Sequence, residues 1–168
     1  FSMVLDDPVS ANIHAFTLVE NTTLVGDKYV TAGSFLIAHS GTHENIYLYT
    51  ATDVGAGTTS GTEELLIDGT ESGIDIDNKI QGLELIENDM TIGGATLTSG
   101  NILLTVSGDD SDGIGSNSLA DVTKNDIISL DVSATTLVNG STVATATLLL
   151  DGSDVNLDSN EEAINALS

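Results

Sequence analysis

Residues 126–150 read DIISLDVSATTLVNGSTVATATLLL, and this stretch decides the fold class. In its first part Ile128, Leu130 and Val132 alternate with small or acidic residues, which is the period of a β-strand with one buried face. Its last part, residues 142–150, ends in three leucines and predicts a strand buried on both sides near its end. A loop that contains glycine separates the two. The stretch therefore predicts two neighbouring strands.

The same pattern runs along the whole chain. Thr, Val, Ile and Leu dominate the apolar segments, and clusters of Gly, Asp, Asn and Ser separate them. No long segment has the 3.6-residue period of a helical crossover, which excludes a parallel α/β fold. We therefore expect an all-β chain, a single antiparallel β-sandwich or jelly roll of about 8–10 strands. The expected strands are 13–19, 28–38, 45–52, 63–68, 80–87, 90–98, 101–107, 126–133 and 142–150.

The chain has 168 residues, which is enough for one hydrophobic core and short for two. We expect a possible N-terminal arm at 1–12, a sandwich domain at 13–158 and a short C-terminal helix or tail at 159–168. Ser159 and Glu162 have the spacing of a capping box, and apolar residues follow them, which favours the helix. The chain begins Phe-Ser-Met-Val, which favours a processed start.

Charge is the strongest global property of the sequence. The chain carries 26 acidic residues and three lysines, for a formal net charge of −23. Nucleic-acid binding needs clustered cations, so this composition excludes it, and an anionic membrane surface would repel the chain. The apolar runs are also far too short for membrane insertion. There is no cysteine, so the core must hold without disulfides.

Two segments are candidates for calcium binding. The first is SGDDSDGIGSNS, residues 107–118, with Asp109, Asp110 and Asp112 as ligands. It does not fit an EF-hand, because Gly108 and Leu119 stand at two ligand positions. A calcium site built from several loops at a sandwich edge is one interpretation, and a solvated hairpin loop is the other.

The second candidate is the spacing Asp154-x-Asn156-x-Asp158, which matches the first three ligands of a calcium loop. It looks like the opening of a dockerin-type loop, although Ser159 stands where that loop has glycine. The capping box that begins at Ser159 explains the same residues without a metal. Calcium is thus the one cofactor that the sequence suggests.

Other constellations are weaker. Asp75 and Asp77 share one face of an extended stretch, where paired carboxylates can hold a cation or flank a glycosidic bond. A glycosidase also needs aromatic platforms, and the chain has no tryptophan. His39 and His43 could be two zinc ligands, but exposed turn histidines explain them as well.

Residues 120–151, ADVTKNDIISLDVSATTLVNGSTVATATLLLD, carry the one resemblance to a known group of proteins. A strand of the form V-T-x-x-D-I-I-x-L-D-V, a loop with glycine and a long Thr/Val/Leu strand resemble the last two strands of small β-sandwich modules in tailed-phage virion proteins. Those modules include head decorations, fibres and tail modules. The resemblance covers about a fifth of the chain and implies a structural or attachment role without catalytic residues.

We therefore expect a non-enzymatic structural protein of a virion surface, a capsid decoration, fibre or tail component. The alternatives are a secreted filament or surface-layer subunit assembled by strand donation, and a calcium-binding adhesin domain at the cell surface. In each case the expected partners are copies of the chain itself or a capsid or tail protein, in a homo-oligomer or polymer. Function would then reside in an interface between proteins.

Overall fold

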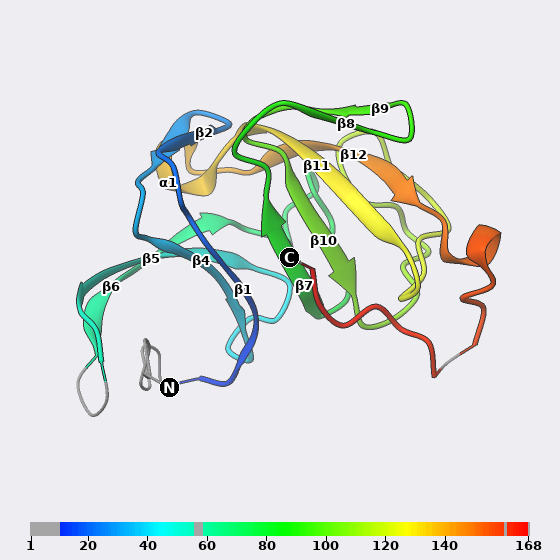
Figure 1. Cartoon of the computed structure of the whole chain (residues 1–168), viewed down its shortest axis with the longest axis horizontal. Helices are drawn as coiled ribbons and strands as arrows, with labels where there is room; N and C mark the ends of the chain where they lie inside the picture. Colours follow the sequence, from blue (N-terminus) through cyan, green and yellow to red (C-terminus); the bar gives the residue numbers. More distant parts are fainter. Residues whose placement is uncertain (1–10, 56–58, 160, 168) are drawn as a thin grey trace.

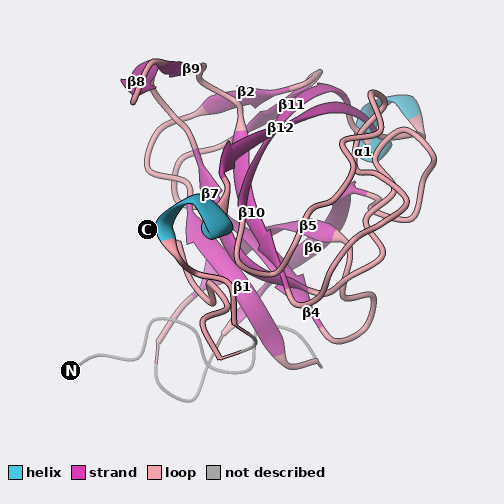
Figure 2. Ribbon diagram, turned by 90° about the vertical axis from the view of Figure 1, so that its right-hand side faces the viewer, coloured by secondary structure: helices cyan, strands magenta, loops and turns pink. Residues whose placement is uncertain are grey.

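The structure, a computed structural model, describes residues 11–55, 59–159 and 161–167. Most of the expected N-terminal arm, residues 1–10, lies outside this range. The described chain is all-β, as predicted, and forms two four-stranded antiparallel sheets and two small hairpins. Figures 1 and 2 show the sheets facing each other as a sandwich with very little helix.

The first sheet has the strand order β1-β4-β5-β6. Its strands are β1 (Ile13–Leu18), β4 (Phe35–His39), β5 (Ile46–Asp53) and β6 (Ser60–Ile67). All three pairings are antiparallel. One face of this sheet turns toward the core, and β1 and β6 are its two edges.

The second sheet has the order β12-β11-β10-β7. Its strands are β7 (Ile80–Leu85), β10 (Ile102–Val106), β11 (Ile127–Ala134) and β12 (Val143–Leu150). β11 and β12 pair antiparallel, so the stretch that predicted two neighbouring strands forms them. The edges of this sheet are β12 and β7.

The core lies between the sheets and is aliphatic. In both sheets every second residue of a strand points into the core. This is why apolar residues recur at every second position of the sequence. Loop residues close its ends. Fully buried members include Leu36, Ile46, Leu66, Ile80, Ile102, Leu104, Ile128 and Leu130 from the strands and Ile74 and Ile114 from the loops.

The strand count differs from the expected 8–10, because the described chain has twelve strands. Two of the expected strands divide at glycines with positive φ. Residues 28–38 divide at Gly33, and residues 90–98 divide at Gly93 and Gly94, where the chain turns back on itself. The additional hairpins are β2 (Thr23–Val25) with β3 (Lys28–Val30), and β8 (Met90–Ile92) with β9 (Ala95–Leu97).

The C-terminal helix expected within 159–168 is absent from the described residues, of which 161–167 are non-helical. The reciprocal bond of the capping box does form, because the Ser159 N–H donates to Glu162 Oε2 over 3.0 Å. No helix follows, since so short a segment gains little from helix formation in isolation. The helical turns that exist are α1 (Thr136–Asn139) and the 3₁₀ turn η1 (Gly152–Val155).

The C-terminal segment instead crosses the outer face of the second sheet. Thr105 Oγ1 on β10 donates to the Ile164 carbonyl over 2.9 Å, and the Ile164 N–H donates to the Lys124 carbonyl over 3.2 Å. Leu167 packs against the apolar cluster of Ile86, Leu97 and Leu103 on that face. Long-range contacts thus replace the local helical pattern.

Two of the four sheet edges are guarded. The Asn117 side chain donates to the Ala146 carbonyl over 2.8 Å and accepts from the Ala146 N–H over 2.9 Å. Its amide thus satisfies both backbone groups of one residue on the edge strand β12, as a neighbouring strand would. On β6, Glu64 pairs with Leu48 and is exposed. A charged side chain on an edge strand discourages further strand pairing. The remaining edges, β1 and β7, lie together.

We expect Thr105→Val to release the C-terminal segment without unfolding the sandwich. The substitution keeps the shape of the side chain but removes the bond to Ile164, at a cost of about 1 kcal/mol. Hydrogen exchange should show faster exchange of the Ile164 amide, and urea unfolding should show a small loss of stability. Thr145→Val, at an exposed position on β12, is the control. Unchanged exchange at Ile164 would contradict this account of the segment.

Candidate functional site

The candidate site is the groove where the edge strands β1 and β7 meet. Thr17 Oγ1 donates to Glu84 Oε2 over 2.9 Å, and three residues further along, just past the end of each strand, the Glu20 N–H donates to Glu87. Because the same offset recurs, the two strands run in the same direction. The two strands belong to different sheets of the sandwich, and among the described residues no ladder joins them.

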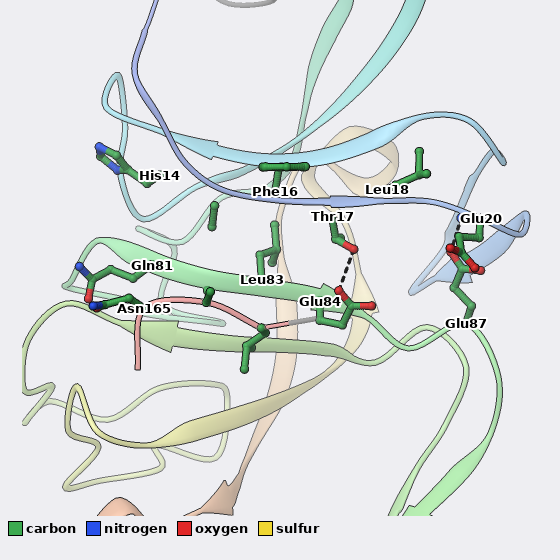
Figure 3. A pocket seen from close by; sticks show the side chains of 14 residues that line it. His14, Phe16, Thr17, Leu18, Glu20, Gln81, Leu83, Glu84, Glu87 and Asn165 are labelled. Atoms are coloured by element: carbon green, nitrogen blue, oxygen red, sulfur yellow. Dashed lines mark hydrogen bonds between the residues drawn. The ribbon is translucent and has the colours of Figure 1, made fainter. Parts of the chain in front are cut away.

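The groove has a volume of about 490 Å³ and follows the whole length of β1. Its walls come from β1, β7, the residues that follow each strand and residues 165–167 of the C-terminal segment. Figure 3 shows His14 and Gln81 at one end, Thr17 and Glu84 joined across the groove, and Glu20 beside Glu87 at the other end.

The groove runs along the strand edges themselves. Side chains of both faces line it, Ala15 and Thr17 from the core-facing side of β1 and Phe16 and Leu18 from the outer side. A depression over one face would expose only alternate residues. β1 and β7 are edge strands of their sheets, and the edges of sheets are the usual sites of strand pairing between chains.

One rim of the groove is apolar and exposed. Phe16 is 56% exposed and Leu18 is 45% exposed, which is unusual for two large apolar side chains two positions apart on one strand. Their neighbours on the same face of β4, Phe35 and Ile37, are buried. Such a rim is typical of a surface that another protein covers.

The two ends of the groove differ in charge. Glu20 and Glu87 make one end acidic, and Glu84 adds a carboxylate nearer the middle. At the other end, burial holds the pKa of His14 below its ordinary value, and the nearby Lys79 ammonium adds to this effect. His14 Nδ1 is buried and has no hydrogen-bond partner among the described residues. At this end the lowered pKa of His14 therefore favours the neutral imidazole.

Two carboxylates hold the two sheets together along the groove. Glu84 accepts the hydroxyl of Thr17, and Glu87 accepts both the backbone N–H and the side-chain amide of Asn21 over 2.7 Å each. These are charge-assisted bonds, but all of them involve side chains. Separating the two strands therefore breaks side-chain bonds and leaves every sheet ladder intact.

The first predicted calcium segment folds around Asp110, which is 1% exposed. Its carboxylate accepts the N–H of Asp77 over 3.1 Å and the N–H of Gly113 over 3.3 Å, so it organises its own loop. Asp110 raises the pKa of Asp77 more than burial does, and Asp112 and Asp75 add to the effect. The structure therefore brings Asp75 and Asp77 close to Asp110 and Asp112, which the sequence separates by more than 30 residues.

The two predicted calcium segments also approach each other. A second pocket of about 290 Å³ is lined by Asp109 from the first segment and Asp158 from the second, with Asp121, Asp126 and Asp151 beside them. Asp154 and Asn156 do not line it. Asp154 belongs to η1, and Asn156 ends that turn in the left-handed conformation.

In residues 11–55, 59–159 and 161–167, no group of three or more His, Asp or Glu side chains is placed to hold a metal ion. Calcium binding therefore stays a prediction. Within the same residues, no helix is long and apolar enough to cross a membrane.

The two turn histidines have different environments. His39 ends β4 and is buried, with Nδ1 accepting the Gly41 N–H over 3.1 Å. Its other ring nitrogen lies 2.6 Å from Glu63 Oε1 and therefore donates to it. His43 is exposed. The interpretation as exposed turn histidines is correct for His43 and wrong for His39, because β4 continues through that residue.

The groove was not visible in the sequence. Its two walls lie 67 positions apart, and neither strand has an unusual pattern of its own. The exposed positions of Phe16 and Leu18 depend on which face of β1 meets the core.

Comparisons with known proteins found no match: the chain matches no protein-family model, no curated protein sequence and no solved structure.

We expect Asp77→Asn to stabilise the protein at neutral pH. The pKa of Asp77 is raised in the folded state, so its protonated form favours folding below the unfolded pKa, and this contribution is lost as pH rises through the folded pKa. Removing the charge should raise the melting temperature at pH 7 and leave it unchanged at pH 3. Asp53→Asn, an exposed position at the end of β5, is the control. An equal increase at both pH values would contradict repulsion among the four aspartates.

Proposed function

We propose that this protein is a non-enzymatic structural subunit that assembles with further copies through the groove between β1 and β7. The observation that carries the proposal is that two of the sheet edges in the described chain are protected against strand pairing and the other two border a groove. The edges at β12 and β6 are guarded, by Asn117 and Glu64 respectively. The edges at β1 and β7 border an open groove with an apolar rim.

A strand edge is the natural docking place for an extended segment of another chain. Backbone hydrogen bonds supply affinity, and alternate side chains supply specificity. An incoming segment can lie along the rim of the groove, where Phe16 and Leu18 offer exposed apolar surface. Beneath this rim the bonds of Thr17 with Glu84 and of Glu20 with Glu87 join the two strands.

The charge of the chain supports assembly through one defined contact. Copies with a net charge of −23 repel each other at most encounters, so chance association of exposed edges is suppressed. Only a contact with backbone pairing and apolar burial would overcome this repulsion. The same charge would repel packaged nucleic acid, which supports a position on the outside of a particle.

We infer a virion surface as the setting, with the chain as a capsid decoration, fibre or tail component. The resemblance of residues 120–151 to phage modules supports this setting, and those residues form β11 and β12 as a paired unit. The groove favours a second candidate, a secreted filament or surface-layer subunit built by strand donation. The pocket lined by Asp109 and Asp158 favours a third, a calcium-binding adhesin domain.

The groove proposal predicts that Phe16→Glu with Leu18→Glu abolishes self-assembly. Both side chains are exposed, so the double variant should fold, but two charges on the rim would prevent an apolar strand from docking. Light scattering should show assemblies for the natural chain in moderate salt and monomers for the variant. Leu24→Glu with Tyr29→Glu is the matched control, an exposed pair on the β2–β3 hairpin.

Assembly that persists in the groove variant, or a natural chain that stays monomeric at high concentration, would overturn the proposal. If the groove variant does abolish assembly, negative-stain images of the natural chain distinguish a filament, seen as open polymers, from a closed oligomer, seen as rings. Repeating the measurement with calcium and with a chelator tests the adhesin candidate. Calcium-dependent assembly would implicate Asp109 and Asp158.

A further inference from the structure

We propose that Asn139 is a site of spontaneous deamidation, and that the Asp27 carboxylate holds this reaction in check while the protein is folded. Conversion of the amide to an acid would release the loop between β11 and β12 from the β2–β3 hairpin. This chemistry goes beyond the proposed function and does not depend on assembly through the groove.

The reaction joins the side chain of an asparagine to the backbone nitrogen of the next residue. Here the nitrogen of Gly140 would attack Cγ of Asn139, and a new C–N bond would close a succinimide ring. The side-chain nitrogen leaves as ammonia and takes the proton of the Gly140 N–H with it. Water then opens the ring at either carbonyl and leaves an aspartate or an isoaspartate, so water is the one co-reactant.

The local sequence supplies the reactive pair. Asn139 is the one asparagine of the chain that precedes a glycine. Glycine hinders the attack least, because it has no Cβ and adopts more backbone conformations than other residues. Gly140 has a φ of 74°, in the left-handed region. Both residues are exposed, so water reaches them.

The folded loop opposes the attack at both reacting atoms. The Gly140 N–H donates to the Thr136 carbonyl over 2.9 Å, which occupies the attacking nitrogen. The side-chain amide of Asn139 donates to Asp27 Oδ2, which restricts its rotation toward Gly140. Both bonds must break before the ring can close, so the reaction requires an opening of α1.

Asp27 binds α1 at both of its ends. It lies in the turn between β2 and β3, and its Oδ1 accepts the Thr135 N–H over 3.1 Å and the Thr135 hydroxyl over 2.6 Å. Its other oxygen accepts the Asn139 amide. The Thr135 hydroxyl lowers the pKa of Asp27 most, and the Asn139 amide adds to this effect. The charged carboxylate therefore fastens the start and the end of the turn to the hairpin.

The turn has few other restraints. It has four residues, none of which is buried, and so short a helix is not stable by itself. Leu137 packs against the core while partly exposed, and the Thr136 hydroxyl lies 2.6 Å from that of Thr142 in the same loop. Segments with so little buried surface open locally at low cost. Loss of the Asp27 carboxylate should therefore raise the population of the open, reactive form.

The product cannot restore the contact that protected the site. Deamidation replaces a hydrogen-bond donor with a second carboxylate opposite Asp27, and two like charges at this distance repel. An isoaspartate also lengthens the backbone of the turn. Because ammonia is lost, the change is not reversed in water. Conversion of Asn139 would thus act as a one-way release of the loop from the hairpin.

The decisive experiment measures the gain in mass at Asn139 by peptide mapping at mildly alkaline pH. It compares the folded natural chain, the same chain unfolded in urea, and folded Asp27→Ala. The folded natural chain should convert slowly and the unfolded chain fast. Asp27→Ala should convert at least about tenfold faster than the folded natural chain, the factor expected for loss of a hydrogen bond to a charged group.

Asp89→Ala is the matched control. Asp89 also accepts a backbone N–H, that of Ser99, beside another hairpin, and its removal should leave the rate at Asn139 unchanged. Asn117 is an internal reference, because its amide is held by two bonds to Ala146 and should convert more slowly than Asn139. Asn139→Gln should abolish the gain in mass at this position.

Asn139→Asp imitates the product and tests the release of the loop. The amide of Thr135 should exchange its hydrogen faster in this variant than in the natural chain, because its acceptor Asp27 is repelled. Unchanged exchange at Thr135 would show that conversion does not open the contact, and the release would be wrong.

The rates decide the remaining parts of the proposal. If Asn139 does not convert even in urea, it is not a deamidation site. If folded Asp27→Ala converts at the natural rate, Asp27 does not protect it and the inference is overturned. Circular dichroism confirms that each variant folds, and Asp27→Asn, which keeps the shape of the side chain, replaces Asp27→Ala if that variant is unfolded.

Discussion

Hydrogen bonding of the strand edges is the constraint on which this structure depends. Two four-stranded sheets that do not close into a barrel have four edges, and each edge carries backbone groups that need partners. At β12 the side-chain amide of Asn117 supplies the missing partner. At β6 the exposed charge of Glu64 discourages strand pairing. In the described part of the chain, β1 and β7 meet along a groove.

The sheets are joined at this groove by side chains and not by a ladder. Glu84 and Glu87 on one side reach Thr17 and Asn21 on the other. Carboxylate bridges can be exchanged for water or for a strand at much lower cost than a ladder of backbone bonds. The groove is therefore closed by side-chain bonds from Thr17, Glu20 and Asn21 to two carboxylates.

The acidic loops have a different physical character. Repulsion among Asp75, Asp77, Asp110 and Asp112 works against folding at neutral pH, as the raised pKa of Asp77 indicates. Asp110 offsets part of this cost through its bonds to two backbone N–H groups. The chain has 26 acidic residues, so repulsion between carboxylates is spread over many loops. The overall charge thus restricts association to surfaces where apolar burial and backbone pairing act together.

The sequence by itself determined the fold class, the strand-rich core and most strand positions, because the inward residues of a half-buried strand recur with a period of two. It could not place the division of the expected strands at Gly33 and Gly93, since a positive φ becomes necessary only when the chain must turn back. It also predicted a C-terminal helix from the pattern around Ser159. The contact of Thr105 with Ile164, a tertiary interaction, prevails over that local pattern.

Only the tertiary structure decided the candidate site. The groove needs β1 and β7 side by side, and that arrangement depends on how the two sheets pack and not on any local pattern. The same holds for Asp109 and Asp158, which belong to two separate segments of the sequence and which the fold brings to one pocket. Periodicity reports which residues face the core. The relative placement of edges and loops comes from packing between distant segments, which a single sequence does not encode in any local signal.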